Sequence, residues 1–147
     1  MLLDVSRATL ADLDDLVPLF DAYRRFYGKT PDAYSARAFL RERIESGESV
    51  VFLARTDGVP AGFTQLYPLF SSTRVARLWL LNDLFVDDGM RGRGVGSVLL
   101  ARAREHALET GACELMLETA VDNPARRLYE RNGYRIDDGY VVYKLAP

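Results

Sequence analysis

A short glycine-rich segment in the middle of the chain has the residue types of a phosphate-binding loop. It reads Arg91-Gly92-Arg93-Gly94-Val95-Gly96-Ser97. Glycine at every second position lets the backbone turn tightly, so that successive N–H groups can point at one ligand. Apolar residues at helical spacing follow as far as Ala107, and the first-turn N–H groups of a helix have no partner within it. With the helix dipole and the two arginines, these groups predict a site for a phosphate or pyrophosphate.

Other glycine-rich motifs fit this segment poorly. The glycine spacing differs from the G-x-G-x-x-G of dinucleotide-binding folds, and no Gly-Lys-Ser/Thr follows as in nucleotide triphosphatases. The alternative that needs no ligand is an ordinary tight connection from a strand to a helix. The alternation of glycine and arginine through the helix start favours the phosphate site.

The elements that position this loop predict one mixed α/β domain over residues 1–147. Alternation predicts a strand over residues 3–7, and β-forming residue types predict strands over 49–55, 59–69 and 74–86. Residues 112–119 are expected to form a buried strand. Helical spacing predicts a helix from a Thr9 cap to Tyr23, loosened by Pro18, and further helices over 35–46, 95–111 and 123–132. The strands from residue 49 to 86 have short connections, such as the turn at 57–58, and should pair antiparallel. The strand–helix–strand unit over 78–119 predicts a parallel pair, and residues 134–136 and 140–145 predict a last strand or hairpin.

Composition excludes several classes of function. The 147 residues carry 19 basic and 21 acidic groups, a net charge of −2, which disfavours a nonspecific nucleic-acid binder. One cysteine and one histidine cannot form a disulfide framework or a Cys/His zinc cluster, so no metal is expected. No long apolar run predicts a membrane span, and residues 1–9 lack a signal-peptide pattern, so we expect a cytoplasmic protein. Residues 90–135 alone carry eight arginines against six acids, so the charge around the loop is mildly positive.

Two segments and the order of the elements resemble the GNAT acyltransferase superfamily. The loop matches that family's R/Q-x-x-G-x-G/A motif through Arg91, Gly94 and Gly96, and the strand over 80–86 precedes it as in the family. The segment from Asn123 to Tyr134 is similar to the family's N-x-x-(A/R)-x-x-x-Y-x-x-x-G-(F/Y), although its Tyr falls six residues after the Asn. The resemblance implies a largely antiparallel sheet with a splayed parallel pair and an N-acetyltransferase that uses acetyl-CoA. The strand Leu-Asn-Asp-Leu-Phe-Val resembles the histone/polyamine branch, which includes the spermidine/spermine and thialysine acetyltransferases.

The resemblance assigns coenzyme contacts to three segments. In the family, loop amides bind the pyrophosphate, the pantetheine lies along the preceding strand, and a segment across the cleft makes further contacts. The residues carried over are Arg91, Gly92, Arg93, Gly94, Val95, Gly96 and Ser97 in the loop, Leu84, Phe85 and Val86 in the strand, and Asn123, Ala125 and Arg126 across the cleft. A bulge in the strand commonly accompanies this arrangement.

The resemblance also implies which groups move protons. Tyr129 is the candidate general acid, because a phenol keeps its proton at neutral pH and can supply it to the leaving thiolate. The alternative is a Tyr that only packs, the role we expect for Tyr134. For the base, Asn82 stands where the polyamine branch has Glu, and Asn cannot accept the proton, although it can orient the amine or a water. Asp83 should face the other side of the strand unless a bulge re-aims it, and Glu118 is the second carboxylate candidate.

The acceptor is the least defined partner. Polyamine enzymes of the branch offer a Tyr-Glu pair, whereas here Tyr23 precedes an arginine, so a polycation is disfavoured. Tyr23, Arg24 and Tyr27 would then contact a carboxylate-bearing, lysine-like amine; a solvated helix face is the alternative. The leading interpretation is direct transfer to a primary amine in a ternary complex, by a homodimer as in the branch. A non-catalytic acyl-CoA sensor or protein-interaction module is the competing one.

Two other single residues have structural interpretations. Trp79 is expected in the core or at a dimer interface. His106 is expected at the surface or its boundary.

Overall fold

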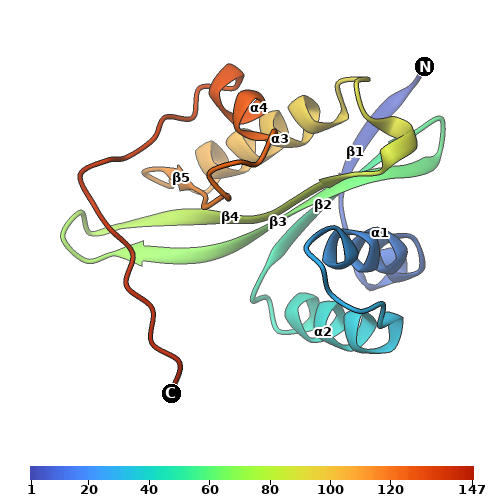
Figure 1. The fold of residues 1–147 in the computed structure, drawn as a ribbon, viewed down its shortest axis with the longest axis horizontal. Coiled ribbons are helices and arrows are strands. Elements are labelled where there is room, and N and C mark those ends of the chain that lie inside the picture. Colours follow the sequence, from blue (N-terminus) through green and yellow to red (C-terminus); the bar gives the residue numbers. More distant parts are fainter.

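The computed structural model describes residues 1–147 and shows one mixed sheet with two helices on each face (Figure 1). The strands are β1 (Leu3–Arg7), β2 (Val50–Thr56), β3 (Val59–Ser71), β4 (Ala76–Val86) and β5 (Leu115–Met116). The helices are α1 (Leu13–Phe26), α2 (Ala33–Glu45), α3 (Val95–Glu109) and α4 (Arg126–Arg131), with 3-10 turns at Leu10–Asp12 and Asp88–Met90. The predicted fold class is confirmed.

The sheet has the order β1-β2-β3-β4-β5, with the first four strands antiparallel and β4 parallel to β5. The turn between β2 and β3 is the predicted one, with positive φ at both Asp57 and Gly58 (50° and 80°). Such a turn matches the twist of the two flanking strands. The parallel pair is the one predicted from the strand–helix–strand unit.

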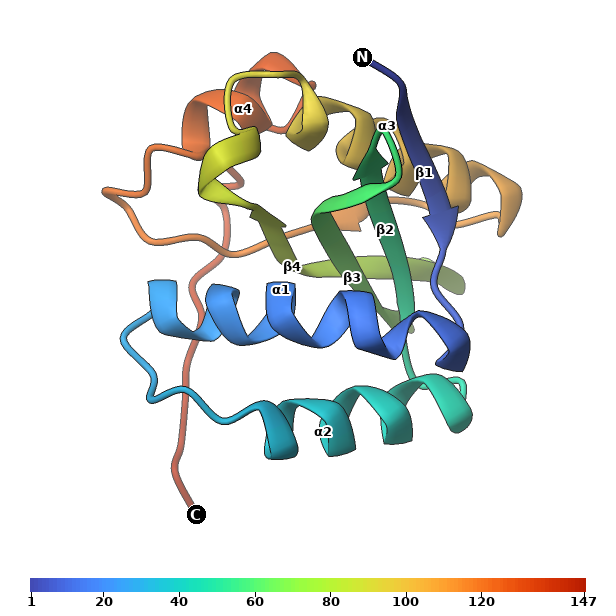
Figure 2. The same ribbon diagram turned by 90° about the vertical axis from the view of Figure 1, so that its right-hand side faces the viewer.

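Two apolar cores lie on opposite faces of the sheet. One forms between the sheet and helices α1 and α2, and the strand residues Phe63 and Phe85 are buried in it. The other forms beneath α3, where Leu81 and Val95 are buried. Figure 2 shows α1 and α2 below the sheet and α3 and α4 above it. The site residues described below therefore sit at the end of β4, between these two layers.

The first helix is more regular than its sequence predicts. Thr9 and Asp12 form the expected capping box. Pro18 lies inside α1, yet the helix runs unbroken from Leu13 to Phe26. Proline removes one intrahelical bond, here the one to the carbonyl of Asp14, and burial of the apolar face of α1 holds the helix together at this position.

The strand expected over residues 112–119 is much shorter. Only Leu115 and Met116 pair with β4, and the segment alternates between half-buried and exposed residues. The expectation of a buried strand is wrong because the segment lies at the edge of the sheet and diverges from β4 after residue 116.

The expected last strand or hairpin is absent. Residues 135–147 form no helix or strand, and no backbone hydrogen bond joins them to the rest of the chain. In Figures 1 and 2 this segment crosses the sheet, and its C-terminal end extends beyond the helices and strands. Strand-forming residue types give a strand only where the segment pairs with a neighbouring strand, and residues 135–147 pair with none. We call residues 135–147 the tail.

His106 is buried, so its predicted surface or boundary position is wrong. Its ring lies 4.7 Å from that of Trp79 and 5.5 Å from that of Phe52, and its relative exposure is 5%. Trp79 is in the core, as expected, and its indole N–H donates to Thr110 Oγ1 at 2.8 Å. No helix of the structure combines the length and apolar character needed to cross a membrane.

Candidate active site

The glycine loop, residues 91–97, takes a backbone conformation that depends on glycine. Gly92 and Gly94 have φ of +76° and +82°, in the left-handed region where a β-carbon is costly. Gly94 is the cap residue of α3, and the helix begins at the next residue. The alternation of glycines seen in the sequence therefore sets the path of the chain into the helix.

The N–H groups of this loop are free. None of the backbone N–H groups from Gly92 to Ser97 donates a hydrogen bond, and the first bonded one is that of Val98, to the carbonyl of Gly94. Six successive free N–H groups at the positive end of a helix form a site suited to an anion.

The two arginines of the glycine loop are placed differently. Arg91 is held locally: it pairs with Asp88 at 3.0 Å and its Nε donates to the carbonyl of Val86 at 3.1 Å. Arg93 is exposed and makes no ion pair or hydrogen bond. Arg93 is thus the guanidinium available to a ligand, while Arg91 fixes the loop to the end of β4.

Beside the glycine loop, β4 has one free edge. Its pairing with β5 ends at Leu80 and Met116, whereas on the other side Leu84, Phe85 and Val86 remain paired with β3. The parallel strands therefore splay, as predicted, and residues 84–86 have no strand partner on that side, where the Val86 carbonyl accepts from Arg91. An extended ligand chain can pair with such an edge.

A bulge at Asn82 changes which face of the sheet the following residues occupy. Leu66 pairs with Leu81 and Gln65 with Asp83, so Asn82 is an extra residue with no partner on β3. Leu81 belongs to the core beneath α3, whereas Phe85, an even number of residues later, belongs to the core beneath α1. The bulge thus turns Asp83 toward α1, which strand alternation alone would not do.

Asp83 is buried at 3% exposure and is held by three side chains. Tyr23 Oη donates to Oδ1 at 3.1 Å, Asn82 Nδ2 donates to the same oxygen at 2.7 Å, and Gln65 Nε2 donates to Oδ2. Burial raises the pKa of the Asp83 carboxyl above its usual range, although the three hydrogen bonds oppose the rise. We call Tyr23, Gln65, Asn82 and Asp83 the Asp83 cluster.

Tyr27, at the end of α1, and Tyr129, in α4, also lie in this region. The ring of Tyr27 lies 5.2 Å from that of Tyr23, and Asn123 Nδ2 donates to its hydroxyl at 3.5 Å. Burial raises the pKa of Tyr129 to about 12, and Tyr27 adds to the rise. Tyr129 therefore keeps its proton at neutral pH. Helices α1 and α4 and the segment before α4 thus meet beside the Asp83 cluster.

The segment across the cleft has a locally defined shape. Asn123 Oδ1 accepts from the N–H of Ala125 at 2.9 Å, and Arg126 Nη1 donates to the carbonyl of Val121. Helix α4 starts at Arg126, slightly later than predicted. At its far end Asn132 Nδ2 reaches Ser97 Oγ at 3.5 Å, so α4 is tied to the start of α3.

Two predicted residues do not join the site. Glu118 is exposed and makes no hydrogen bond with the Asp83 cluster. The guanidinium of Arg24 donates to the carbonyl of Thr30 at 3.1 Å and lies 3.8 Å from Asp21, so it is used within the N-terminal helices. Of the predicted acceptor residues, the structure brings together Tyr23, Tyr27 and Asn82.

Three residues of β3 surround Asp83 although the sequence did not single them out. Gln65 and Thr64 are fully buried, and Thr64 Oγ1 donates to the Asp83 carbonyl at 2.8 Å. Burial and the charge of Asp83 raise the pKa of Tyr67 to about 12. The available signal was the pair Thr64-Gln65, two polar residues inside an otherwise apolar strand.

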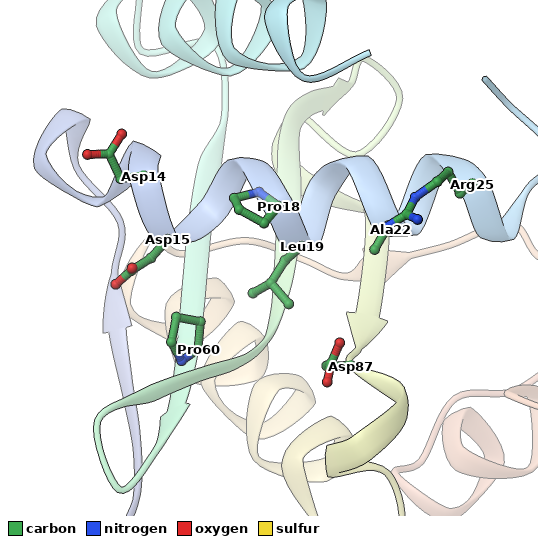
Figure 3. Close-up of a pocket in the computed structure, with 8 residues that line it drawn as sticks. All are labelled: Asp14, Asp15, Pro18, Leu19, Ala22, Arg25, Pro60 and Asp87. Atoms are coloured by element: carbon green, nitrogen blue, oxygen red, sulfur yellow. The ribbon is translucent and has the colours of Figure 1, made fainter. Parts of the chain in front are cut away.

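A hollow of about 370 Å³ lies elsewhere, between α1 and the ends of β3 and β4 (Figure 3). Its lining includes three aspartates and a single arginine: Asp14, Asp15, Asp87 and Arg25. None of the predicted coenzyme or proton-transfer residues lines it. Three carboxylates disfavour an anionic ligand, so we do not place the coenzyme there. No group of three or more His, Cys, Asp or Glu side chains is arranged to hold a metal ion.

Comparisons with known proteins agree with this geometry. The acetyltransferase (GNAT) family model matches residues 16–134. The chain is 44% identical to the uncharacterized N-acetyltransferase YhfO of Bacillus subtilis over 97% of both chains. A crystal structure of a probable acetyltransferase, 41% identical, superposes with a TM-score of 0.93 and covers 98% of this chain and 97% of its own. A predicted acetyltransferase of Clostridium acetobutylicum, solved with acetyl-CoA, shares the fold at 15% identity, with a TM-score of 0.79 over 97% and 96% of the two chains.

These findings identify the class of reaction as well as the fold. The relatives are N-acetyltransferases, and enzymes of this family take acetyl-CoA as co-substrate. The chain therefore belongs to the GNAT family of acetyltransferases and is an acetyl-CoA-dependent acyltransferase.

Proposed function

We propose that the chain transfers an acetyl group from acetyl-CoA directly to a primary amine, with both substrates bound at once. The observation that carries this proposal is the run of six free N–H groups from Gly92 to Ser97, which leads onto the free edge of β4 beside the Asp83 cluster. The glycine loop then binds the anionic part of the coenzyme at one end of the cleft, and the Asp83 cluster binds the amine at the other end.

The coenzyme half of the cleft uses backbone groups. The free N–H groups of residues 92–97 and the exposed Arg93 bind the pyrophosphate. The free edge of Leu84, Phe85 and Val86 pairs with the pantetheine arm, and Asn123, Ala125 and Arg126 close the cleft from the far side. Acetyl-CoA supplies a thioester, whose carbonyl carbon an amine can attack.

The acceptor half uses side chains. An amine of ordinary pKa is protonated at neutral pH and must lose a proton before it attacks. Asp83 takes that proton, directly or through a water, because burial raises its pKa toward the working pH. Tyr23 keeps its own proton and donates to Asp83 Oδ1, which fixes the orientation of the carboxylate. Asn82, the exposed member of the cluster, orients the amine.

Tyr129 completes the proton balance. As the new C–N bond forms and the C–S bond breaks, the Tyr129 hydroxyl donates its proton to the leaving sulfur. Burial raises the pKa of Tyr129 to about 12, so its hydroxyl holds the proton at neutral pH until the C–S bond breaks. The nitrogen loses a second proton as it becomes the amide, and this proton restores the Tyr129 hydroxyl, while the first one leaves Asp83 for solvent.

We further propose a small, cationic amine or a lysine-like side chain as the acceptor. The buried carboxylate of Asp83 and the rings of Tyr23 and Tyr27 attract a cation. The strand residues Asn82 to Val86 resemble the histone/polyamine branch, but Asn82 replaces its Glu, so the proton passes to Asp83 instead. Because acyl-CoA substrates are found inside cells, we expect the reaction in the cytoplasm.

The test is thiol release from acetyl-CoA across a panel of polyamines, lysine-like amines, aminosugars and lysine peptides. We expect turnover with one class, and Tyr129→Phe should lower kcat by about 10²-fold or more while acetyl-CoA binding is retained. Tyr134→Phe is the matched control, because the Tyr134 ring packs beside Tyr129 at 6.0 Å but has no proposed chemical role. Full activity of Tyr129→Phe would remove Tyr129 from the mechanism. Acetyl-CoA binding without turnover on any amine would favour the sensor.

A further inference from the structure

The Asp83 carboxylate is too well covered to receive a proton by direct contact with an amine. It is 3% exposed, and its two oxygens already accept hydrogen bonds from Tyr23, Asn82 and Gln65. An ammonium group that reached either oxygen would displace one of these donors and leave a polar group without its partner, which is unfavourable in a buried place. A proton therefore reaches Asp83 most easily through one of the three donors.

Of these three donors, only Tyr23 can pass a proton on. Asn82 and Gln65 donate through amide nitrogens, which give hydrogen bonds but accept none. A hydroxyl has one O–H to give and lone pairs with which to accept another proton. Tyr23 Oη lies 3.1 Å from Asp83 Oδ1, and Tyr23 is partly exposed whereas Asp83 is buried. Its hydroxyl therefore joins the carboxylate to the cleft by a group that can both give and accept a proton.

The aromatic neighbours of Tyr23 hold its hydroxyl in place. Its ring lies 5.7 Å from that of Phe63 and 6.2 Å from that of Phe85, both of which are buried. On the other side lies the ring of Tyr27, at 5.2 Å, and Tyr27 is half-exposed. Because aromatic rings attract cations, an ammonium group beside the ring of Tyr27 lies next to the Tyr23 side chain.

We infer that Tyr23 relays the first proton of the acceptor amine to Asp83, an inference that rests on the proposed function. One N–H bond of the ammonium group breaks as a new O–H bond forms on Tyr23 Oη. The original O–H bond of Tyr23 breaks at the same time, and Asp83 Oδ1 gains that hydrogen. The net change is one proton moved from nitrogen to Asp83, while Tyr23 ends as it began. A water that bridges the ammonium group and Tyr23 leaves this balance unchanged.

The hydrogen bonds around Tyr23 suit both ends of this step. Before the transfer its O–H donates to Asp83 Oδ1. Afterwards the protonated Asp83 donates to Tyr23 Oη, and the new hydroxyl hydrogen has the Asn82 carbonyl, 3.4 Å away, as its acceptor. Burial and the charge of Asp83 raise the pKa of Tyr23, so a free tyrosinate is unfavourable and the two transfers occur together. The reverse relay returns the proton from Asp83 to solvent.

The test compares two amines as acceptors for the full chain, by thiol release from acetyl-CoA at about pH 8.5. Pentylamine mimics a lysine side chain and is protonated at this pH. Its analogue 2,2-difluoropentylamine has the same chain, but the fluorines withdraw electrons and leave the amine mostly neutral, so it needs no base before it attacks. Tyr23→Phe should lower kcat/KM about 10²-fold for pentylamine and less than about threefold for the difluoro analogue.

Two control variants separate a lost relay from other defects. Gln65→Met also removes a donor from Asp83 but leaves the hydroxyl of Tyr23, so it should lower kcat/KM for pentylamine by less than about tenfold. Tyr67→Phe removes the hydroxyl of another tyrosine near Asp83 that makes no hydrogen bond with it, and should keep the wild-type rate with both amines. Melting curves should show that all variants are folded.

A loss in Tyr23→Phe no larger than that in Gln65→Met would overturn the relay, because Tyr23 would then only orient the carboxylate. An equal loss with both amines would also overturn it, since the defect would not lie in removal of the first proton. In either case a large loss in Asp83→Asn with pentylamine would leave the proposed function in place. Full activity of Asp83→Asn, or no turnover of pentylamine by the wild type, would overturn the proposed base or the lysine-like acceptor, and the relay with it.

Discussion

The Asp83 cluster is centred on β4 and the glycine loop follows the end of that strand. The two regions offer a ligand different kinds of groups. The glycine loop offers backbone N–H groups that are exposed and unpaired, whereas the Asp83 cluster offers a carboxylate that is buried and bonded to three side chains. Binding a phosphate requires free N–H groups held in place, while accepting a proton requires a carboxylate of raised pKa. The difference indicates that coenzyme affinity and proton transfer can be altered separately.

The largest expected effect comes from removing the carboxylate. Asp83→Asn keeps the size of the side chain but cannot accept a proton, so kcat should fall by about 10²–10⁴-fold. Glu118→Gln is the matched control, because it removes the other carboxylate considered as base and should leave kcat unchanged. Steady-state thiol release measures both. A larger loss in Glu118→Gln than in Asp83→Asn would reverse the assignment.

The next effect is on the glycine loop. A β-carbon at the positive φ of Gly94 costs about 1–2 kcal/mol, so Gly94→Ala should weaken acetyl-CoA binding roughly tenfold. Gly89→Ala is the control within the same connection, since its β-carbon would meet only Asp87 Oδ2 at 3.6 Å, an ordinary contact. Calorimetry on both variants measures the difference. Equal affinities would show that the loop conformation is not what binds the coenzyme.

A smaller effect should appear in the pH dependence. Gln65 lowers the pKa of Asp83 by donating to it, so Gln65→Met should raise that pKa further. Asp83 acts as a base only when ionised; activity is therefore lost as the pH falls through its pKa, and the acid limb of kcat/KM should move to higher pH. Thr64→Val removes only the bond to the Asp83 carbonyl and should leave the limb in place. Identical limbs in all three proteins would disconnect Gln65 from the base.

The smallest effect concerns the stability of α3, the helix that carries the glycine loop. Burial lowers the pKa of His106, the only histidine of the chain, below its usual 6.5. As the pH falls through that value the unfolded chain gains a proton that the folded chain does not, so stability should decrease between pH 7 and pH 5.5. Melting curves should show a Tm decrease of a few degrees in the wild type. The decrease should be smaller in His106→Phe, and an equal decrease in both would exclude His106 as its source.

Local sequence patterns predicted the glycine loop and the hairpin at Asp57-Gly58 because backbone conformation at a glycine depends on that residue and its neighbours. The strand–helix–strand pattern predicted the parallel pair, and the resemblance to the GNAT family predicted the splay. The position of Asp83 depends on the register of β4 against β3 and on the bulge at Asn82. The residue pattern of β4 alone does not reveal either of them. Gln65 was missed for the same reason, since its partner lies across the sheet.

The predictions for His106 and for residues 135–147 were wrong for different reasons. His106 follows Leu99 and Ala103 at helical spacing on the buried face of α3, but we expected it at the surface or its boundary. The tail was predicted as a strand from its residue types, and those types are strand-forming. The structure pairs these residues with no strand, and residue types alone do not contain that information.

The separation of the two regions is tested most directly by calorimetric titration of acetyl-CoA into Asp83→Asn. The predicted result is a dissociation constant within about twofold of the wild type in a protein that has lost nearly all turnover. A loss of coenzyme affinity as large as the loss of kcat would contradict it, because Asp83 would then serve the binding site and not the transfer of the proton.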